Sequence, residues 1–277
     1  MRHIPPPEIN AKRHFLNCIS KVGSASKKRE LTEIAPVIDN AAKEYKRLAK
    51  KSLLHSMKNR NCGISTKRLK RLYEYRMVNK KQPGRAVYDK IILSAPNRFC
   101  PFCAQRRVSS VDHFLCKSKF PELATIPNNL VPSCSDCNKT KDAYHPSKRA
   151  EQLLHPYFDN VKVRWLLAKI VKLNGKALLV FSVAKNTALS RVLVKRIENH
   201  FQIFELAELY SIHATGELRD IEHEHEIVRS HGGSKAAKEH LLAQAKSRER
   251  TNPNSWKTAA YFAMHDSKEF CSGLLKF

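Results

Sequence analysis

The sequence predicts an α+β protein that is mostly helical and carries one small module held together by a metal ion. Three observations support this fold class. Hydrophobic residues make up 42% of the 277 residues, which is enough for a packed core. Over most of the chain the apolar residues recur every three or four positions, as they do on one face of a helix. Near the middle, two C-x-x-C pairs interrupt this pattern.

The first region, residues 1–95, is predicted to be helical and basic. Apolar residues at helical spacing indicate helices over residues 37–59 and 66–80. Lysine and arginine fill many of the positions between them, including Lys46, Arg47, Lys50 and Lys51. Two interpretations of these helices stay open. They are either amphipathic helices with a solvated basic face or a platform that contacts the backbone of a nucleic acid.

Two further regions are predicted at residues 96–160 and 161–277. The first is dense in Cys, His, Asp and Asn. In the second, two strands joined by a hairpin turn precede a series of helices. The strands are expected at 161–170 and 177–183, the turn at 172–176, and helices at 219–230, 234–248 and 255–270, with breaks at 231–233 and 252–254. His223 and His225 alternate with glutamates, which indicates exposed positions on a helix.

The chain carries 51 Lys and Arg against 25 Asp and Glu, a formal net charge of +26 with neutral histidines. The excess is greatest in residues 1–90. A charge of this size favours a polyanionic partner, either a nucleic acid or an anionic membrane surface. No apolar run reaches the roughly 18 residues that a membrane span needs, and the first residues lack the apolar core of a signal peptide. We therefore expect a cytoplasmic protein that does not enter the membrane.

Four of the eight cysteines form two C-x-x-C pairs, Cys100 with Cys103 and Cys134 with Cys137. Two such pairs supply four thiolates at the corners of a tetrahedron, which is the arrangement of structural zinc sites. A thioredoxin-like redox role is the main alternative, but the βαβ pattern that would accompany it is absent from the sequence around the pairs. We therefore predict a closed four-cysteine Zn²⁺ site that holds its segment together and does not catalyse.

The segment around these cysteines carries further polar residues in a fixed order. They are Asp112 and His113 between the pairs, Asn129 at the start of an Asn-Leu-Val-Pro run, and Asn138 and Lys141 after the second pair. Together these positions, within residues 98–145, resemble the motif of the HNH endonucleases. The resemblance implies a ββα-metal module, with strands expected at residues 107–114 and 129–132 followed by one helix.

The resemblance also implies a role for each motif residue. His113 would be the base that activates water, because an imidazole can take up a proton near neutral pH. Asn129 would fix the backbone near His113 and so orient the imidazole. Asp112 and Asn138 match the metal-ligand positions of the family. Their oxygen atoms suit Mg²⁺ or Mn²⁺ as a catalytic ion.

Three further residues, Lys141, Asp142 and His145, lie near the end of this predicted helix. Asp142 lies four residues after Asn138, so both would project from one helix face, and Asp142 is either a further ligand of the catalytic ion or an exposed helix residue. Lys141 is placed to contact phosphate. His145 is expected to be a surface residue.

These expectations describe a metal-dependent endonuclease that hydrolyses phosphodiester bonds of DNA, with RNA as a less favoured substrate. Residues 153–159 (LLHPYFD) also resemble the segment after the motif in bacterial HNH proteins of phage-defence loci, including Septu-like ones. Two alternatives stay open. One is a zinc-stabilised nucleic-acid-binding protein without catalysis. The other is a nuclease subunit that is silent until an ATPase partner licenses it, since the chain has no P-loop of its own.

Overall fold

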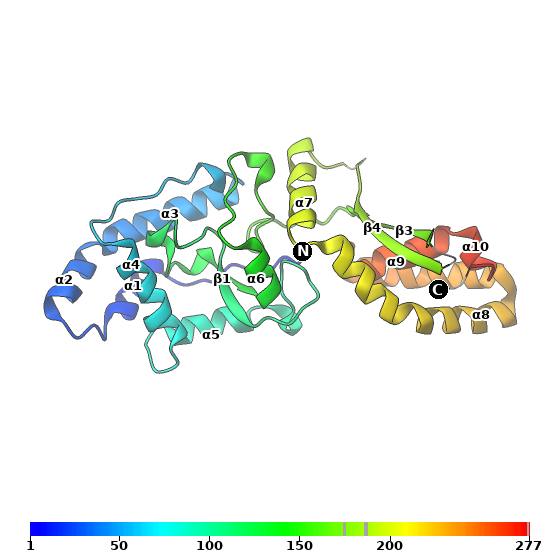
Figure 1. The fold of residues 1–277 in the computed structure, drawn as a ribbon, viewed down its shortest axis with the longest axis horizontal. Coiled ribbons are helices and arrows are strands. Elements are labelled where there is room, and N and C mark those ends of the chain that lie inside the picture. The colour runs from blue at the N-terminus through cyan, green and yellow to red at the C-terminus, as the bar shows by residue number, and fades with distance from the viewer. Residues whose placement is uncertain (174–175, 186–187, 276) are drawn as a thin grey trace. The chain divides into compact units, whose positions relative to one another are not determined.

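The structure is a computed structural model that describes residues 1–173, 176–185, 188–275 and 277. It has an α+β fold in which helices predominate and two small antiparallel sheets lie among them, as the sequence predicted (Figure 1). The chain divides into two compact units, Met1–Asn160 and Val161–Phe277. We refer to them as unit 1 and unit 2. None of the helices in the described ranges is long and apolar enough to cross a membrane.

Unit 1 begins with five helices, and the first four of them start with a polar cap or with a proline in the first turn. They are α1 (Ala11–Ile19), α2 (Ala25–Glu33), α3 (Ala35–Lys50), α4 (Thr66–Tyr73) and α5 (Arg85–Leu93). The side chains of Asn10, Ser24 and Ser65 accept hydrogen bonds from backbone N–H groups of the first turns of α1, α2 and α4. Helix α3 has a proline in its first turn, where the missing N–H would have no helical partner.

Two helices of unit 1 differ in length from the sequence prediction. The helix predicted over 37–59 ends at Lys50, because Ser52 adopts a left-handed backbone with φ of 54°. The chain then forms the short 3-10 helix η1 (Leu54–Ser56). The helix predicted over 66–80 is regular only as far as Tyr73, after which it continues as the π-helix η2 (Glu74–Val78).

The middle of unit 1 is a two-stranded sheet followed by a short helix. Strands β1 (Ser110–His113) and β2 (Leu130–Ser133) pair antiparallel with His113 opposite Leu130, and α6 (Ser135–Lys141) follows directly. The strands are shorter than, or shifted by one residue from, the ranges expected at 107–114 and 129–132. Helix α5 packs against both strands (Figure 1). The short 3-10 helices η3 (Pro96–Arg98), η4 (Pro121–Leu123), η5 (Pro127–Asn129) and η6 (Arg149–Glu151) complete the unit.

Residues 153–159 connect this sheet to helix α3. The side chain of His155 is buried, its Nε2 lies 2.9 Å from the Tyr45 hydroxyl on α3, and its ring stacks on Phe114 next to β1. The Tyr157 hydroxyl donates a hydrogen bond of 2.6 Å to the carbonyl of Leu130 in β2. The segment that resembles defence-locus proteins therefore has a packing role here, because it fixes the sheet to the helices around it.

Unit 2 is a hairpin covered by helices. Strands β3 (Leu166–Leu173) and β4 (Lys176–Val183) pair antiparallel, and helices α8 and α9 pack against each other and against the strands (Figure 1). Its helices are α7 (Arg191–Ile203), α8 (Leu206–Thr251), α9 (Trp256–Asp266) and α10 (Lys268–Cys271). The first strand begins five residues later than predicted. The predicted turn over 172–176 includes residues 174–175, which lie outside the described residues.

The long helix α8 corrects two predictions. The helices expected at 219–230 and 234–248 are parts of one element, and the predicted break at 231–233 is a kink at Gly233, whose φ of 71° only glycine adopts easily. His225 was expected to be exposed but is buried. Its ring stacks on Phe270 with ring centroids 4.7 Å apart, because α10 folds back over this face of α8.

Candidate metal centre and adjoining cavity

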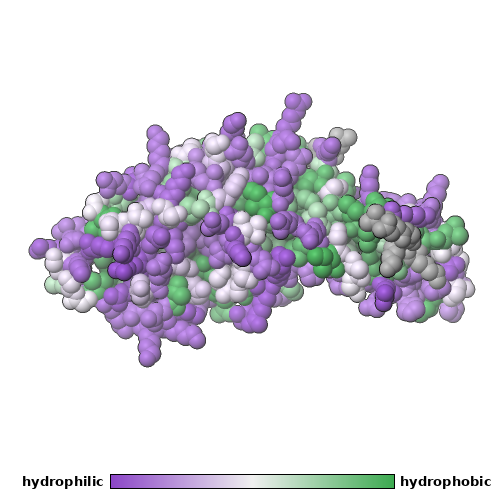
Figure 2. Space-filling view, in the orientation of Figure 1, coloured by the Kyte–Doolittle hydropathy of each residue, from purple (hydrophilic) through white to green (hydrophobic). Residues whose placement is uncertain are grey.

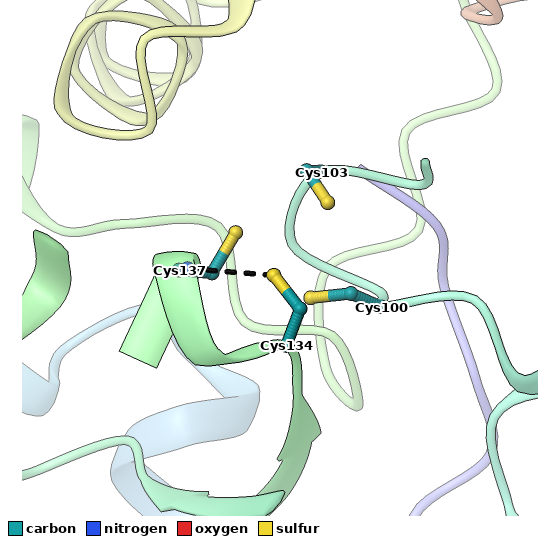
Figure 3. Close-up of side chains that lie close together, drawn as sticks. All are labelled: Cys100, Cys103, Cys134 and Cys137. Atoms are coloured by element: carbon teal, nitrogen blue, oxygen red, sulfur yellow. Dashed lines mark hydrogen bonds between the residues drawn. The ribbon is translucent and has the colours of Figure 1, made fainter. Parts of the chain in front are cut away.

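The four paired cysteines come together in one buried cluster (Figure 3). Cys100 and Cys103 lie on the loop before β1, whereas Cys134 and Cys137 lie at the start of α6. Their sulfur atoms all lie within 4.8 Å of one another. Backbone N–H groups of Arg106 and Cys137 point to the sulfurs of Cys103 and Cys134, each at 3.4 Å. This donor set can hold one metal ion and matches the four-thiolate chemistry that Zn²⁺ prefers.

Asp112, the third residue of strand β1, is a buried carboxylate without a complete set of partners. The residue is 7% exposed, and its Oδ2 makes no hydrogen bond within the described part of the chain. The Nζ of Lys141 lies 3.2 Å from this oxygen, which is ion-pair distance without hydrogen-bond geometry. Burial raises the pKa of Asp112 to about 6, and the nearby Lys141 opposes this shift. An oxygen in this state can accept a cation.

Lys141 has a different use from the one expected. The residue is only 1% exposed, although its side chain was expected to face phosphate. Its Nζ donates hydrogen bonds to the backbone carbonyls of His113, at 2.9 Å, and Asp142, at 3.3 Å. Lys141 therefore joins helix α6 to the end of β1 from inside the protein. No pattern in the sequence indicates this, because a lysine on a short helix is ordinarily a surface residue.

His113 is held in one orientation at the end of β1. Its Nε2 lies 2.8 Å from the backbone carbonyl of Ala124, so this nitrogen carries the hydrogen and Nδ1 is left as the basic atom. The ring also packs edge-on against Tyr73 of α4, with ring centroids 4.4 Å apart. Burial lowers the pKa of His113 to about 3, and the charges of Lys117 and Lys141 act in the same direction. The imidazole is therefore neutral at pH 7.

Asn129 fixes the loop between the two strands. It is fully buried, its Oδ1 accepts a hydrogen bond from the backbone N–H of Leu115, and its Nδ2 donates to the carbonyls of Leu115 and Leu123. Leu123 directly precedes Ala124, whose carbonyl holds the imidazole of His113. Asn129 therefore makes no direct contact with the ring in the described hydrogen-bond network. It acts on the loop that carries the acceptor.

Asn138 and Asp142 lie at helix α6 and its end, near Asp112. The Nδ2 of Asn138 donates to the Ser110 hydroxyl at 3.1 Å, which leaves the amide oxygen of Asn138 as an acceptor. Asp142 is not on the helix face that the sequence suggested, since α6 ends at Lys141 and Asp142 has φ of 38°. Its charge nevertheless raises the pKa of Asp112, so the two carboxylates are near each other.

A cavity of about 910 Å³ brings these groups together. Asp112, His113, Asn138 and Asp142 all line it, with Lys117 and Lys139 at the same surface. Tyr73 and Lys117 are lining residues that the sequence did not single out, because both contribute only through the tertiary packing of α4 and the loop after β1. The cavity thus offers a neutral imidazole, two carboxylates and an amide oxygen side by side.

The four basic residues singled out on α3 and directly after it lie elsewhere in unit 1. Lys46, Arg47, Lys50 and Lys51 are all exposed, and none of them lines the cavity. Arg47 has one weak partner, Glu44, at 4.0 Å. Figure 2 shows hydrophilic side chains over much of the visible face of unit 1. These cations are therefore available to a polyanion in solution.

Comparison with known proteins gives two similarities. The chain is 28% identical to protein ea31 of Escherichia phage lambda over 227 residues, which are 76% of each chain. It is 30% identical to the Septu protein PtuB of Bacillus thuringiensis over 159 residues, which are 50% of this chain and 61% of that protein. No family model matches the chain. No solved structure matches it either.

Proposed function

We propose that the protein is a metal-dependent endonuclease of the HNH type that hydrolyses phosphodiester bonds of DNA. The observation that carries this proposal is the shared cavity. It is lined by the neutral imidazole of His113 and by the oxygen-bearing side chains of Asp112, Asn138 and Asp142. Hydrolysis of a phosphodiester requires a base for water and a cation beside the phosphate, and these side chains supply the first and can bind the second.

In the proposed reaction His113 takes the proton of the attacking water at Nδ1. The bond from Nε2 to the carbonyl of Ala124 keeps Nδ1 directed and unprotonated. Asn129 is a positioning residue, because it fixes the loop that supplies that carbonyl. The low pKa of His113 means that the base form predominates at neutral pH, while binding of the dianionic transition state would favour the protonated form.

Asp112, Asn138 and Asp142 are the proposed ligands of the catalytic ion. The Oδ2 of Asp112, which makes no hydrogen bond within the described residues, and the amide oxygen of Asn138 are hard donors, which suit Mg²⁺ or Mn²⁺. Such an ion, when bound, neutralises charge on the scissile phosphate. The four cysteines have a separate task, because a closed four-thiolate zinc site has no open position for substrate. We assign them a structural Zn²⁺.

The similarity to the Septu protein supports a role in antiviral defence, and the net charge of +26 supports DNA as the polyanion. In this proposal the module at residues 96–160 carries the chemistry, residues 1–95 contribute basic helices, and residues 161–277 form a separate region. In an alternative form of the proposal, the nuclease is silent until an ATPase partner licenses it.

Incubation of the purified full chain with plasmid DNA, linear DNA and RNA tests the proposal. Each substrate is incubated with Mg²⁺, with Mn²⁺ and without added divalent ion. We expect cleavage of DNA only where the ion is present, and weaker cleavage of RNA. Binding of DNA without cleavage under every condition would contradict the nuclease proposal for the isolated chain and favour the alternative of a binding protein. Activity that appears only on addition of a partner would favour licensing.

A further inference from the structure

A second cavity, of about 730 Å³, adjoins the first within unit 1. We call it the arginine cavity. Arg85, Tyr88, Asp89, Arg98, Arg107 and Ser109 are among the residues that line it. Tyr88 and Ser109 line both cavities, so the two are neighbours on one surface. A ligand long enough to leave the cavity of His113 on this side would therefore meet the arginines.

Two of the three arginines are not neutralised by the protein. Arg85 is engaged, since its guanidinium bonds Asp89 at 2.8 Å. Arg98 and Arg107 are exposed, and within the described residues neither guanidinium has a hydrogen-bond or ion-pair partner. The single carboxylate that lines the arginine cavity is thus already paired. The cavity keeps two free positive charges in the form best suited to bidentate contact with phosphate.

Backbone pairing next to Cys100 holds these two arginines close to each other. Arg107 pairs with Phe99 in an isolated antiparallel bridge, and the backbone N–H of Val108 donates to the carbonyl of Arg98 at 2.8 Å. Cys100 immediately follows this pairing and donates its N–H to Arg106 at 2.8 Å. Arg98 also has φ of 58°, a conformation that a non-glycine residue keeps only when its surroundings impose it. Their placement is therefore built by the fold.

We propose that the arginine cavity binds the sugar–phosphate backbone of duplex DNA beside the bond that is cut. The proposal rests on the nuclease function proposed above, and it adds a subsite that the motif residues do not include. Arg98 and Arg107 would each contact a phosphate. Because these contacts reach no base edge, the subsite would hold DNA of any sequence in register with His113.

The test measures DNA binding by the full chain in a His113→Ala background, so that cleavage does not interfere. The variant Arg98→Ala/Arg107→Ala is compared with Lys27→Ala/Arg29→Ala, a control that removes two exposed cations of α2 that line neither cavity. The probes are two labelled duplexes of unrelated sequence. Zinc content and the circular dichroism melting curve verify that each variant is folded.

Removing two phosphate contacts should lower the slope of log affinity against log salt by roughly 1.8, for both duplexes alike. Between about 50 mM and about 200 mM salt, binding by the parent should then weaken about twelvefold more than binding by the double alanine variant. Arg98→Lys/Arg107→Lys should keep the parental slope, because it retains both charges. The same cleavage assay with intact His113 should show slower cutting at limiting DNA for the alanine variant only.

Equal slopes for the double alanine variant and the α2 control would overturn the subsite, while cleavage by the parent would leave the nuclease function standing. The subsite would also be overturned if the lysine variant lowered the slope of log affinity against log salt as much as the alanine variant does, since the lost charge would then not explain the lower slope. A parent that neither bound nor cut DNA would remove the nuclease function and the subsite together.

Discussion

Asp112, which lines the cavity, forms a buried ion pair with Lys141, and the two side chains are 8% and 0% exposed. A pair of this kind is sensitive to the loss of one partner, because the other charge is left buried without compensation. Lys141→Met should therefore lower the free energy of unfolding by about 3–5 kcal/mol at neutral pH. Chemical denaturation of the zinc-loaded protein measures this.

Lys139→Met is the matched control, because Lys139 lies on the same helix and is exposed. It should change the stability by less than about 0.5 kcal/mol. The deficit of Lys141→Met should shrink in acid, since protonation of Asp112 removes the uncompensated charge. Equal stability of the two variants would show that the ion pair does not contribute to folding.

His14 predicts a dependence of stability on pH. Its ring is buried, Nδ1 has no hydrogen bond within the described residues, and burial lowers the pKa of His14 to about 4. Between about pH 6.5 and about pH 4 the unfolded chain therefore binds a proton that the folded chain does not. Stability should be unaffected by His14 above this window and should fall by about 3 kcal/mol as the pH is lowered through it.

Denaturation as a function of pH compares the parent with His14→Leu and with His3→Leu, which removes an exposed histidine. The free energy of unfolding of His14→Leu should depend less steeply on pH than that of the parent. Some dependence should remain, because the pKa of His113 is also lowered by burial. If the free energy of unfolding of His14→Leu and of His3→Leu depended on pH as steeply as that of the parent, the burial of His14 would not control its protonation.

At the scale of elements, the cluster of four cysteines links the loop before β1 to helix α6. We expect about one zinc per chain, and Cys134→Ser should lose the metal and unfold residues 98–145, since structural zinc contributes on the order of 10 kcal/mol to small metal-bound modules. Metal analysis and amide hydrogen exchange of that segment measure both effects. Cys116→Ser, at a cysteine outside the cluster, should keep the zinc. A zinc-free chain with this segment still protected would refute the structural role.

The elements that the sequence predicted well are those with local signals. The spacing of Cys100, Cys103, Cys134 and Cys137 was enough to predict their cluster, because four thiolates near one ion need only two short knuckles. The order of two strands and a helix was predicted from the motif. Periodicity likewise located α3, α4, α8 and α9, although it could not detect that Gly233 bends α8 without ending it.

The parts that the sequence did not predict depend on tertiary context. Lys141 faces inward because the end of β1 offers it a carboxylate and a carbonyl, which no local pattern records. Asp142 leaves the helix face because α6 ends one residue earlier. Ser52 ends α3 with a left-handed backbone, although the sequence has no glycine there to mark the end. In each case a neighbour distant in sequence, or a single backbone angle, decided the outcome.

At the scale of the whole molecule, the positive charge of α3 and the segment after it should set the affinity for nucleic acid. Reversing Lys46, Arg47, Lys50 and Lys51 to Glu should weaken binding similarly for unrelated DNA sequences. The log–log salt slope should fall by roughly 3.6, because four phosphate contacts are lost. Titration of labelled DNA at several salt concentrations measures the slope. An unchanged slope would mean that these exposed residues are only a solvated face.

The account depends most on His113 as the base of a DNA-cleaving site. The most direct test is the cleavage rate of plasmid DNA at saturating Mg²⁺ for the parent, for His113→Ala and for His145→Ala, a control histidine that packs on Phe120 and does not line the cavity. We predict that His113→Ala loses roughly a hundredfold to ten-thousandfold in rate while it keeps its zinc and its DNA binding, and that His145→Ala cuts at nearly the parental rate. Cleavage by His113→Ala at the parental rate would contradict the account.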